Sequence, residues 1–103
     1  MTKNIIDPKE AGSKAGYKVA MELFHKTSYF IEQREFINLC IKTVISNPNR
    51  TERDGTGLSG KSHEAYELGI FIGVKKYLNK IKNLHVYRYV EKDIRKQIKD
   101  KWK

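Results

Sequence analysis

The chain has few cysteines, prolines or tryptophans: one Cys, two Pro and one Trp in 103 residues. The single cysteine, Cys40, can form no internal disulfide and has no second thiolate with which to build a metal cage. An oxidising compartment is therefore not implied. Cys40 lies among apolar residues at helical spacing, so we expect a small buried hydrophobe rather than a nucleophile.

Long hydrophobic runs are also absent. The longest apolar stretch, LGIFIGV at 68–74, is about a third of a membrane span, and the N-terminal MTKNIIDP has no apolar signal region. A chain of this length forms one domain with one modest core, which excludes multi-domain enzymes. We expect a soluble, cytoplasmic protein.

The first segment carries a strong helix start signal. Asp7 can cap the free amides, Pro8 occupies the first helical position and Glu10 follows three residues after the cap. Apolar residues then recur at three- and four-residue spacing, and those in the first half are small enough for close backbone approach. We predict a helix over about 8–25.

A second helix is predicted over about 28–46, capped by Thr27 or Ser28 and ended by Pro48. The segment 47–61 follows, rich in glycine and charge. It is the only long loop in the pattern, and its length leaves a functional loop and a plain connection equally open.

The third helix is predicted over about 62–83, capped by Ser62, and the fourth over about 90–102. The third is apolar on nearly every side, which is typical of a central, buried helix. Its Gly69 and Gly73 favour close helix packing, with a homodimer as the alternative. The fourth has a narrow apolar stripe among basic residues. The fold expected is an all-α single domain of about four helices.

Positive charge is concentrated at the C-terminal end. Residues 75–103 hold eleven of the 21 Lys and Arg but only three of the 12 Asp and Glu, so they account for eight of the nine net charges. Such asymmetry favours a globular body with one face for a polyanion. We therefore predict a small, non-catalytic nucleic-acid-binding or regulatory protein. The residues expected to bind phosphates are Lys76, Lys80, Arg88, Lys92, Arg95, Lys96 and Lys99.

Two other partners stay open. The same face, with Tyr87, Tyr89 and Trp102 as anchors, would suit an acidic protein that this module binds or inhibits. A membrane-surface or immunity-type role would instead insert Ile94, Ile98 and Trp102 at an anionic interface. High Lys, Ile and Asn usage is associated with AT-rich sources such as low-GC bacteria and their phages or other mobile elements.

The segment GTGLSGKS, residues 55–62, matches the phosphate-loop pattern of nucleotide-binding enzymes letter for letter. That mechanism also needs a buried strand just before the first glycine, and the charged run at 50–54 cannot form one. We therefore do not expect an NTPase. A simpler anion site at the start of the third helix remains possible, and its residues would be Arg50, Arg53, Gly60, Lys61 and Ser62.

No catalytic or metal constellation stands out. His63 and Glu67 are one helical turn apart, but a third ligand is lacking. We expect no enzyme activity, no metal and no cofactor.

Overall fold

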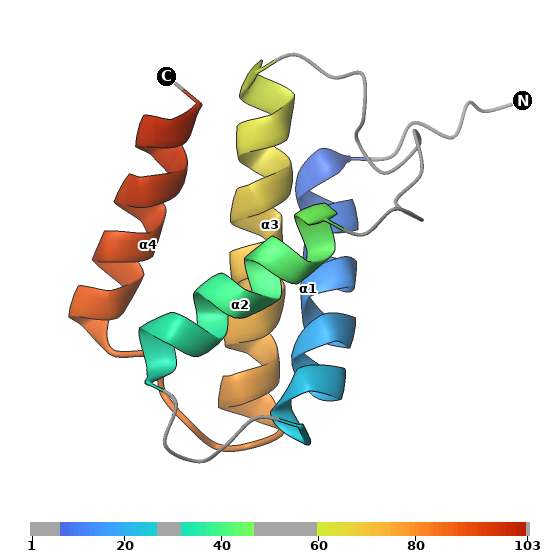
Figure 1. Ribbon diagram of the computed structural model, residues 1–103, viewed down its shortest axis with the longest axis vertical. Coiled ribbons are helices and arrows are strands. Elements are labelled where there is room, and N and C mark those ends of the chain that lie inside the picture. Colours follow the sequence, from blue (N-terminus) through green and yellow to red (C-terminus); the bar gives the residue numbers. More distant parts are fainter. Residues whose placement is uncertain (1–6, 27–31, 47–59, 103) are drawn as a thin grey trace, which may run out of the picture.

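The computed structural model describes residues 7–26, 32–46 and 60–102. Across these ranges the chain forms four helices and no strand (Figure 1): α1 (Pro8–Phe24), α2 (Gln33–Ser46), α3 (Gly60–Lys80) and α4 (Arg88–Lys101). The all-α prediction is confirmed. None of the described helices is both long and apolar enough to span a bilayer.

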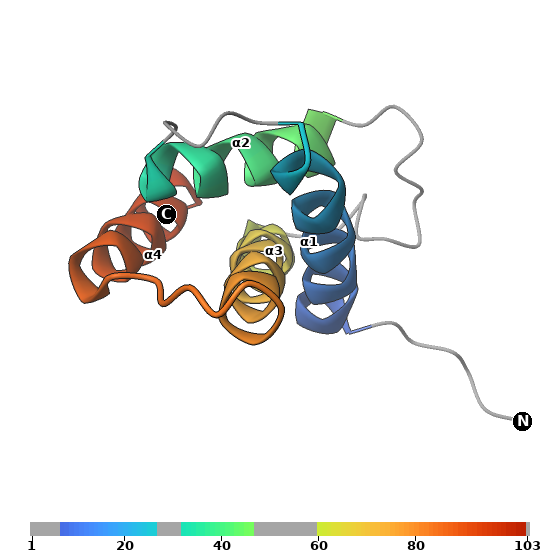
Figure 2. The same cartoon turned by 90° about the horizontal axis from the view of Figure 1, so that it is seen from below.

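The third helix is central, as predicted. Figure 2 shows α1 and α4 on opposite sides of α3, with α2 lying across one side of the group. The views together show α1 running parallel to α3 and α4 running antiparallel to it. None of the four described helices covers the side of α3 that faces away from α2.

The contact between α1 and α3 is built on four glycines, Gly12 and Gly16 in α1 and Gly69 and Gly73 in α3. A Cβ added to Gly16 would lie 2.2 Å from the carbonyl oxygen of Ile70, and one added to Gly73 only 2.0 Å from that of Ser13. These distances leave no room for a side chain, so the helix backbones touch directly. The Gly69–Gly73 pair therefore serves packing within the chain. We call this contact the glycine seam.

The hydrophobic core lies between α3 and the other three helices. Its largest fully buried side chains include Phe71, Ile37, Ile70 and Ile94. Around them pack further apolar residues from every helix. Cys40 is buried among these residues, and burial raises the pKa of its thiol to about 12. The thiol is therefore held in its unreactive protonated form, as expected from its apolar surroundings.

The first helix begins as predicted, because the Asp7 carboxylate accepts a hydrogen bond from the amide of Lys9 at 3.3 Å. The second begins at Gln33, five residues later than predicted, and its first deeply buried side chains are Phe36 and Ile37. The predicted caps Thr27 and Ser28 lie outside the described residues.

The third helix begins two residues before its predicted cap, so Ser62 lies within the first turn and is not the cap. It ends at Lys80, three residues earlier than predicted, where Asn83 adopts a left-handed backbone conformation with φ of 55°. The amide of Leu84 then donates to the carbonyl of Leu78 at 2.8 Å. Asn tolerates this conformation better than most residues, which explains the stop.

Candidate nucleic-acid interface

One face of α4 is committed to the core. Val90, Ile94 and Ile98 are 2%, 0% and 4% exposed, respectively. Their four-residue spacing places them in one line along the helix, as the narrow apolar stripe predicted. The helix begins at Arg88, two residues before the predicted start. The opposite face of α4 is therefore turned to solvent along its whole length.

Two acids of α4 lie on its flanks and are tied to neighbouring helices. Glu91 accepts from Lys75 of α3 at 2.9 Å and from Arg95 at 2.9 Å. Asp93 accepts from Arg34 of α2 at 2.8 Å. The hydrogen bond from Lys75 is the main reason that the pKa of Glu91 lies below its ordinary value, against the opposing effect of partial burial. These contacts hold negative charge at the helix edges.

Basic residues line the centre of the outward face of α4. Arg88, Lys92, Arg95 and Lys99 follow each other at four-, three- and four-residue spacing, which places them in one line about 16 Å long. Lys96 lies beside this line, and all five side chains are exposed. We call these five residues the α4 basic stripe.

Some cations of the stripe are in ion pairs and others are not. Arg95 and Lys96 pair with Glu91 and Asp100 of the same helix, at 2.9 Å and 3.2 Å. Such exposed pairs contribute roughly 0.3–0.5 kcal/mol, so a phosphate can replace the carboxylate at small cost. Arg88, Lys92 and Lys99 form no ion pair with any described residue. These three are the most available cations of the stripe.

The structure does not bring Lys76 and Lys80 into this stripe. Lys76 lies three residues after Gly73, and Lys80 seven residues after it, so both belong to the α1 side of α3. Lys75, by contrast, faces α4 through Glu91. The cations predicted to share one face therefore lie on two: Lys76 and Lys80 on the α1 side of α3, and the others on α4.

The predicted anion loop is only partly described. Arg50 and Arg53 lie outside the described residues. Gly60, Lys61 and Ser62 form the first turn of α3, so their backbone lies at a helix N-terminus. A helix N-terminus does not by itself identify an anion site.

The three predicted aromatic anchors have different surroundings. Tyr87 and Tyr89 are 57% and 63% exposed and stack on each other, with ring centroids 5.7 Å apart. Trp102 is half-buried instead. Its ring stacks on His63 at 4.9 Å, and its indole N–H donates to the Glu67 carboxylate. Trp102 therefore anchors α4 to α3, and its contact with a partner stays a prediction.

Glu67 has a structural role that its position in the sequence did not predict. It is the buried acid of the described chain, 2% exposed, and it accepts from Trp102 and from Lys101 at 2.8 Å. A buried carboxylate is stable only when it is paired and hydrogen-bonded, and here α4 supplies both partners. The available signal was a lone acid within the apolar stretch of α3, opposite a basic C-terminal helix.

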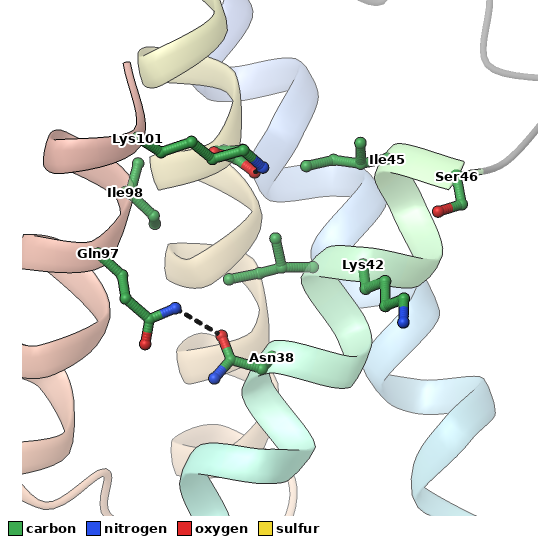
Figure 3. Close-up of a pocket in the computed structure, with 9 residues that line it drawn as sticks. Asn38, Lys42, Ile45, Ser46, Gln97, Ile98 and Lys101 are labelled. Atoms are coloured by element: carbon green, nitrogen blue, oxygen red, sulfur yellow. Dashed lines mark hydrogen bonds and ion pairs between the residues drawn. The ribbon is translucent and has the colours of Figure 1, made fainter. Parts of the chain in front are cut away.

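An open pocket of about 420 Å³ lies between α2, α3 and α4 (Figure 3). Gln97 donates across its mouth to Asn38 at 3.4 Å, a long and weak hydrogen bond. Gln97 lies on the flank of α4 that faces α2, away from Arg95 and the α4 basic stripe. The residues lining the pocket are Asn38, Ile41, Lys42, Ile45, Ser46, Glu67, Gln97, Ile98 and Lys101. It is a separate feature from the basic stripe.

No group of three or more potential metal-binding His, Cys, Asp or Glu side chains occurs in residues 7–26, 32–46 and 60–102. His63 and Glu67, which are one turn apart, are both engaged by Trp102. Comparisons with family models, curated proteins and solved structures give no match to this chain. The chemistry of the surface is therefore the basis for a functional argument.

Proposed function

We propose that this protein is a small cytoplasmic, non-catalytic nucleic-acid-binding or regulatory accessory protein that holds the phosphate backbone with the α4 basic stripe. The observation that supports this is the separation of charge around α4. Five exposed cations occupy the outer face, while the three acids of α4 are all in ion pairs: Glu91 with Lys75, Asp93 with Arg34, and Asp100 with Lys96. A polyanion approaching the helix from solvent meets positive charge first.

The dimensions of the stripe suit a phosphate backbone. About 16 Å of helix is long enough for the stripe to lie along several consecutive phosphates of one strand. The backbone that carries the stripe is already helical, so binding requires ordering of the Lys and Arg side chains but not of the backbone. Contacts of this kind fix position on the backbone and carry no sequence information.

The fold weakens one alternative. A membrane-surface role depended on Ile94, Ile98 and Trp102 facing an anionic bilayer. The two isoleucines are 0% and 4% exposed, and Trp102 is held by Glu67. Insertion would require α4 to leave the body of the protein and expose the core. An acidic protein partner remains the rival that the same cations would serve.

Salt-dependent fluorescence anisotropy with labelled duplex DNA and single-stranded RNA tests the proposal. The variant Arg88→Gln, Lys92→Gln, Lys99→Gln removes the three cations that lack a described ion pair. Each phosphate contact contributes about 0.9 to the slope of log K against log salt for duplex and about 0.7 for single strands. We expect the triple variant to lower the slope by about two to three.

The control variant removes the same charge from the other side of the molecule. Lys14, Lys18 and Lys26 are exposed, on or just after α1, which Figure 2 shows on the far side of α3 from α4. Changing all three to Gln should leave most of the slope intact. Equal losses in both variants would show a general charge effect and overturn the stripe. Absence of binding at low salt would reject nucleic acid and direct the search to an acidic protein.

A further inference from the structure

Two exposed tyrosines stand at the start of the α4 basic stripe without an evident role in folding. Tyr87 and Tyr89 keep more than half of their surface in solvent, and their rings are parallel within 9°. Tyr17 and Tyr77, which pack against one another at the core, instead meet edge to face at 5.6 Å. Leaving two large rings exposed forgoes hydrophobic stabilisation that burial would give. The pair is therefore available as a contact surface.

The backbone that carries these rings is held firmly. The side-chain amide of Gln33 donates to the carbonyl of His85 at 2.8 Å and accepts from the amide of Tyr87 at 2.8 Å. Both ends of one side chain thus fix the connector against the start of α2. A ring on a fixed backbone has less freedom to lose when a ligand stacks on it, so binding is favoured.

The rings and the free cations alternate along the chain. Arg88 lies between the two tyrosines, and Lys92 follows Tyr89 by three residues. Neither cation forms an ion pair with a described residue. Aromatic rings interleaved with cations are the recurrent surface for single strands, where bases stack and phosphates are neutralised.

A hollow of about 280 Å³ lies beside the rings and favours a base over a phosphate. It is lined by Glu32, Gln33, Arg34, Tyr87, Tyr89 and Val90. The exposed carboxylate of Glu32 repels phosphate but accepts hydrogen bonds from the N–H groups of bases, including the ring N–H of thymine. The Arg34 guanidinium is already held by Asp93. Bases would face this hollow while the backbone follows the stripe.

We infer that the Tyr87–Tyr89 pair stacks unpaired bases, so that the ligand of the α4 basic stripe is single-stranded nucleic acid rather than duplex. This rests on the proposed function. The bases of a duplex are stacked on one another, so they offer no free face to a protein surface. A single strand offers free faces for the tyrosines and phosphates for Arg88 and Lys92.

The test compares two labelled strands that carry the same phosphates: an oligothymidine and an abasic strand of equal length. The full chain is titrated with each, and with duplex, by anisotropy. We expect the oligothymidine to bind about tenfold more tightly than the abasic strand, as one stacked base implies. The variant Tyr87→Ala, Tyr89→Ala should abolish this ratio and leave the salt slope unchanged. Tyr87→Phe, Tyr89→Phe keeps the rings and should restore the ratio.

The outcomes separate this inference from the proposed function. If both strands bind equally and the tyrosine variants change nothing, the stacking role is wrong, while a steep salt slope still supports phosphate binding. If duplex binds more tightly than oligothymidine, the single-strand preference is overturned. If no strand binds at low salt, the proposed function itself fails. Both tyrosines are exposed, so the alanine variant is expected to fold, and circular dichroism verifies this.

Discussion

The helices α1 and α4 lie on opposite sides of α3 but are attached to it in different ways. The α1 contact is backbone against backbone, through Gly16 and Gly73 among others. The α4 contact is made by side chains, namely a narrow apolar stripe, ion pairs on its flank and the buried Glu67.

This difference separates stability from function. In the glycine seam a backbone carbonyl oxygen of the facing helix occupies the space where each Cβ would stand. No flexible side chain could move aside for a larger residue, so the backbones themselves would have to shift. The α4 contact uses only the inner face and one edge of the helix. The outer face is free to vary in charge without cost to the core. We expect changes in the glycine seam to affect folding and changes in the α4 basic stripe to affect binding.

The largest effect is expected from Gly16→Ala. In an ordinary helix interior this change stabilises by roughly 1 kcal/mol. Here the new Cβ would lie 2.2 Å from the carbonyl oxygen of Ile70, so α1 and α3 must move apart. We expect a net loss of about 3 kcal/mol or more in the free energy of unfolding, measured in urea. Lys14→Ala, at an exposed position of the same helix, should be nearly neutral. An unchanged or raised stability in Gly16→Ala would show that the seam is looser than described.

Glu67→Ala tests the attachment of α4 in the same way. It leaves the indole N–H of Trp102 and the ammonium of Lys101 without their acceptor. We expect a loss of about 2–3 kcal/mol. Because Trp102 is the only tryptophan, its fluorescence should shift to the red while most helix content remains. As a control, Glu64→Ala removes another carboxylate of α3 and should leave the fluorescence of Trp102 unchanged. Loss of all structure in Glu67→Ala would contradict the view that α4 is attached separately.

The four helices could be predicted because each has a local cause. Asp7 and Pro8 mark the start of α1, and the apolar residues of α4 repeat every four residues. Such signals need no knowledge of the rest of the chain. The start of α2 was missed because Thr27 and Ser28 resemble caps, whereas the first deep contact of the helix comes only at Phe36.

The grouping of the candidate site was less predictable. Clustering in sequence placed Lys76 and Lys80 with the cations of α4, but the rotation of α3 is set by the glycine seam and turns them towards α1. Trp102 was placed with the exposed anchors for a similar reason. Its partner Glu67 lies 35 residues away, so only the tertiary fold reveals the hydrogen bond. Within the candidate site, the cations of α4 kept their predicted relation, whereas those of α3 did not join them.

The smallest effect expected concerns Glu91, which joins α4 to α3 through Lys75 at 2.9 Å. Its pKa is lowered in the folded protein, so its ion pairs stabilise the fold fully above the ordinary value of 4.5 and lose that effect as the pH falls through the lowered pKa. Glu91→Gln should therefore cost about 0.5–1 kcal/mol at neutral pH and almost nothing at a pH below the lowered pKa of Glu91. Urea denaturation of both proteins at each pH measures the difference, and the other titrating groups cancel in it. Glu22→Gln, at an exposed α1 position without a described ion pair, should show no difference at either pH. If the cost of Glu91→Gln were the same at both pH values, the ion pairs would not be its cause, and the contact of α4 would depend on its apolar stripe alone.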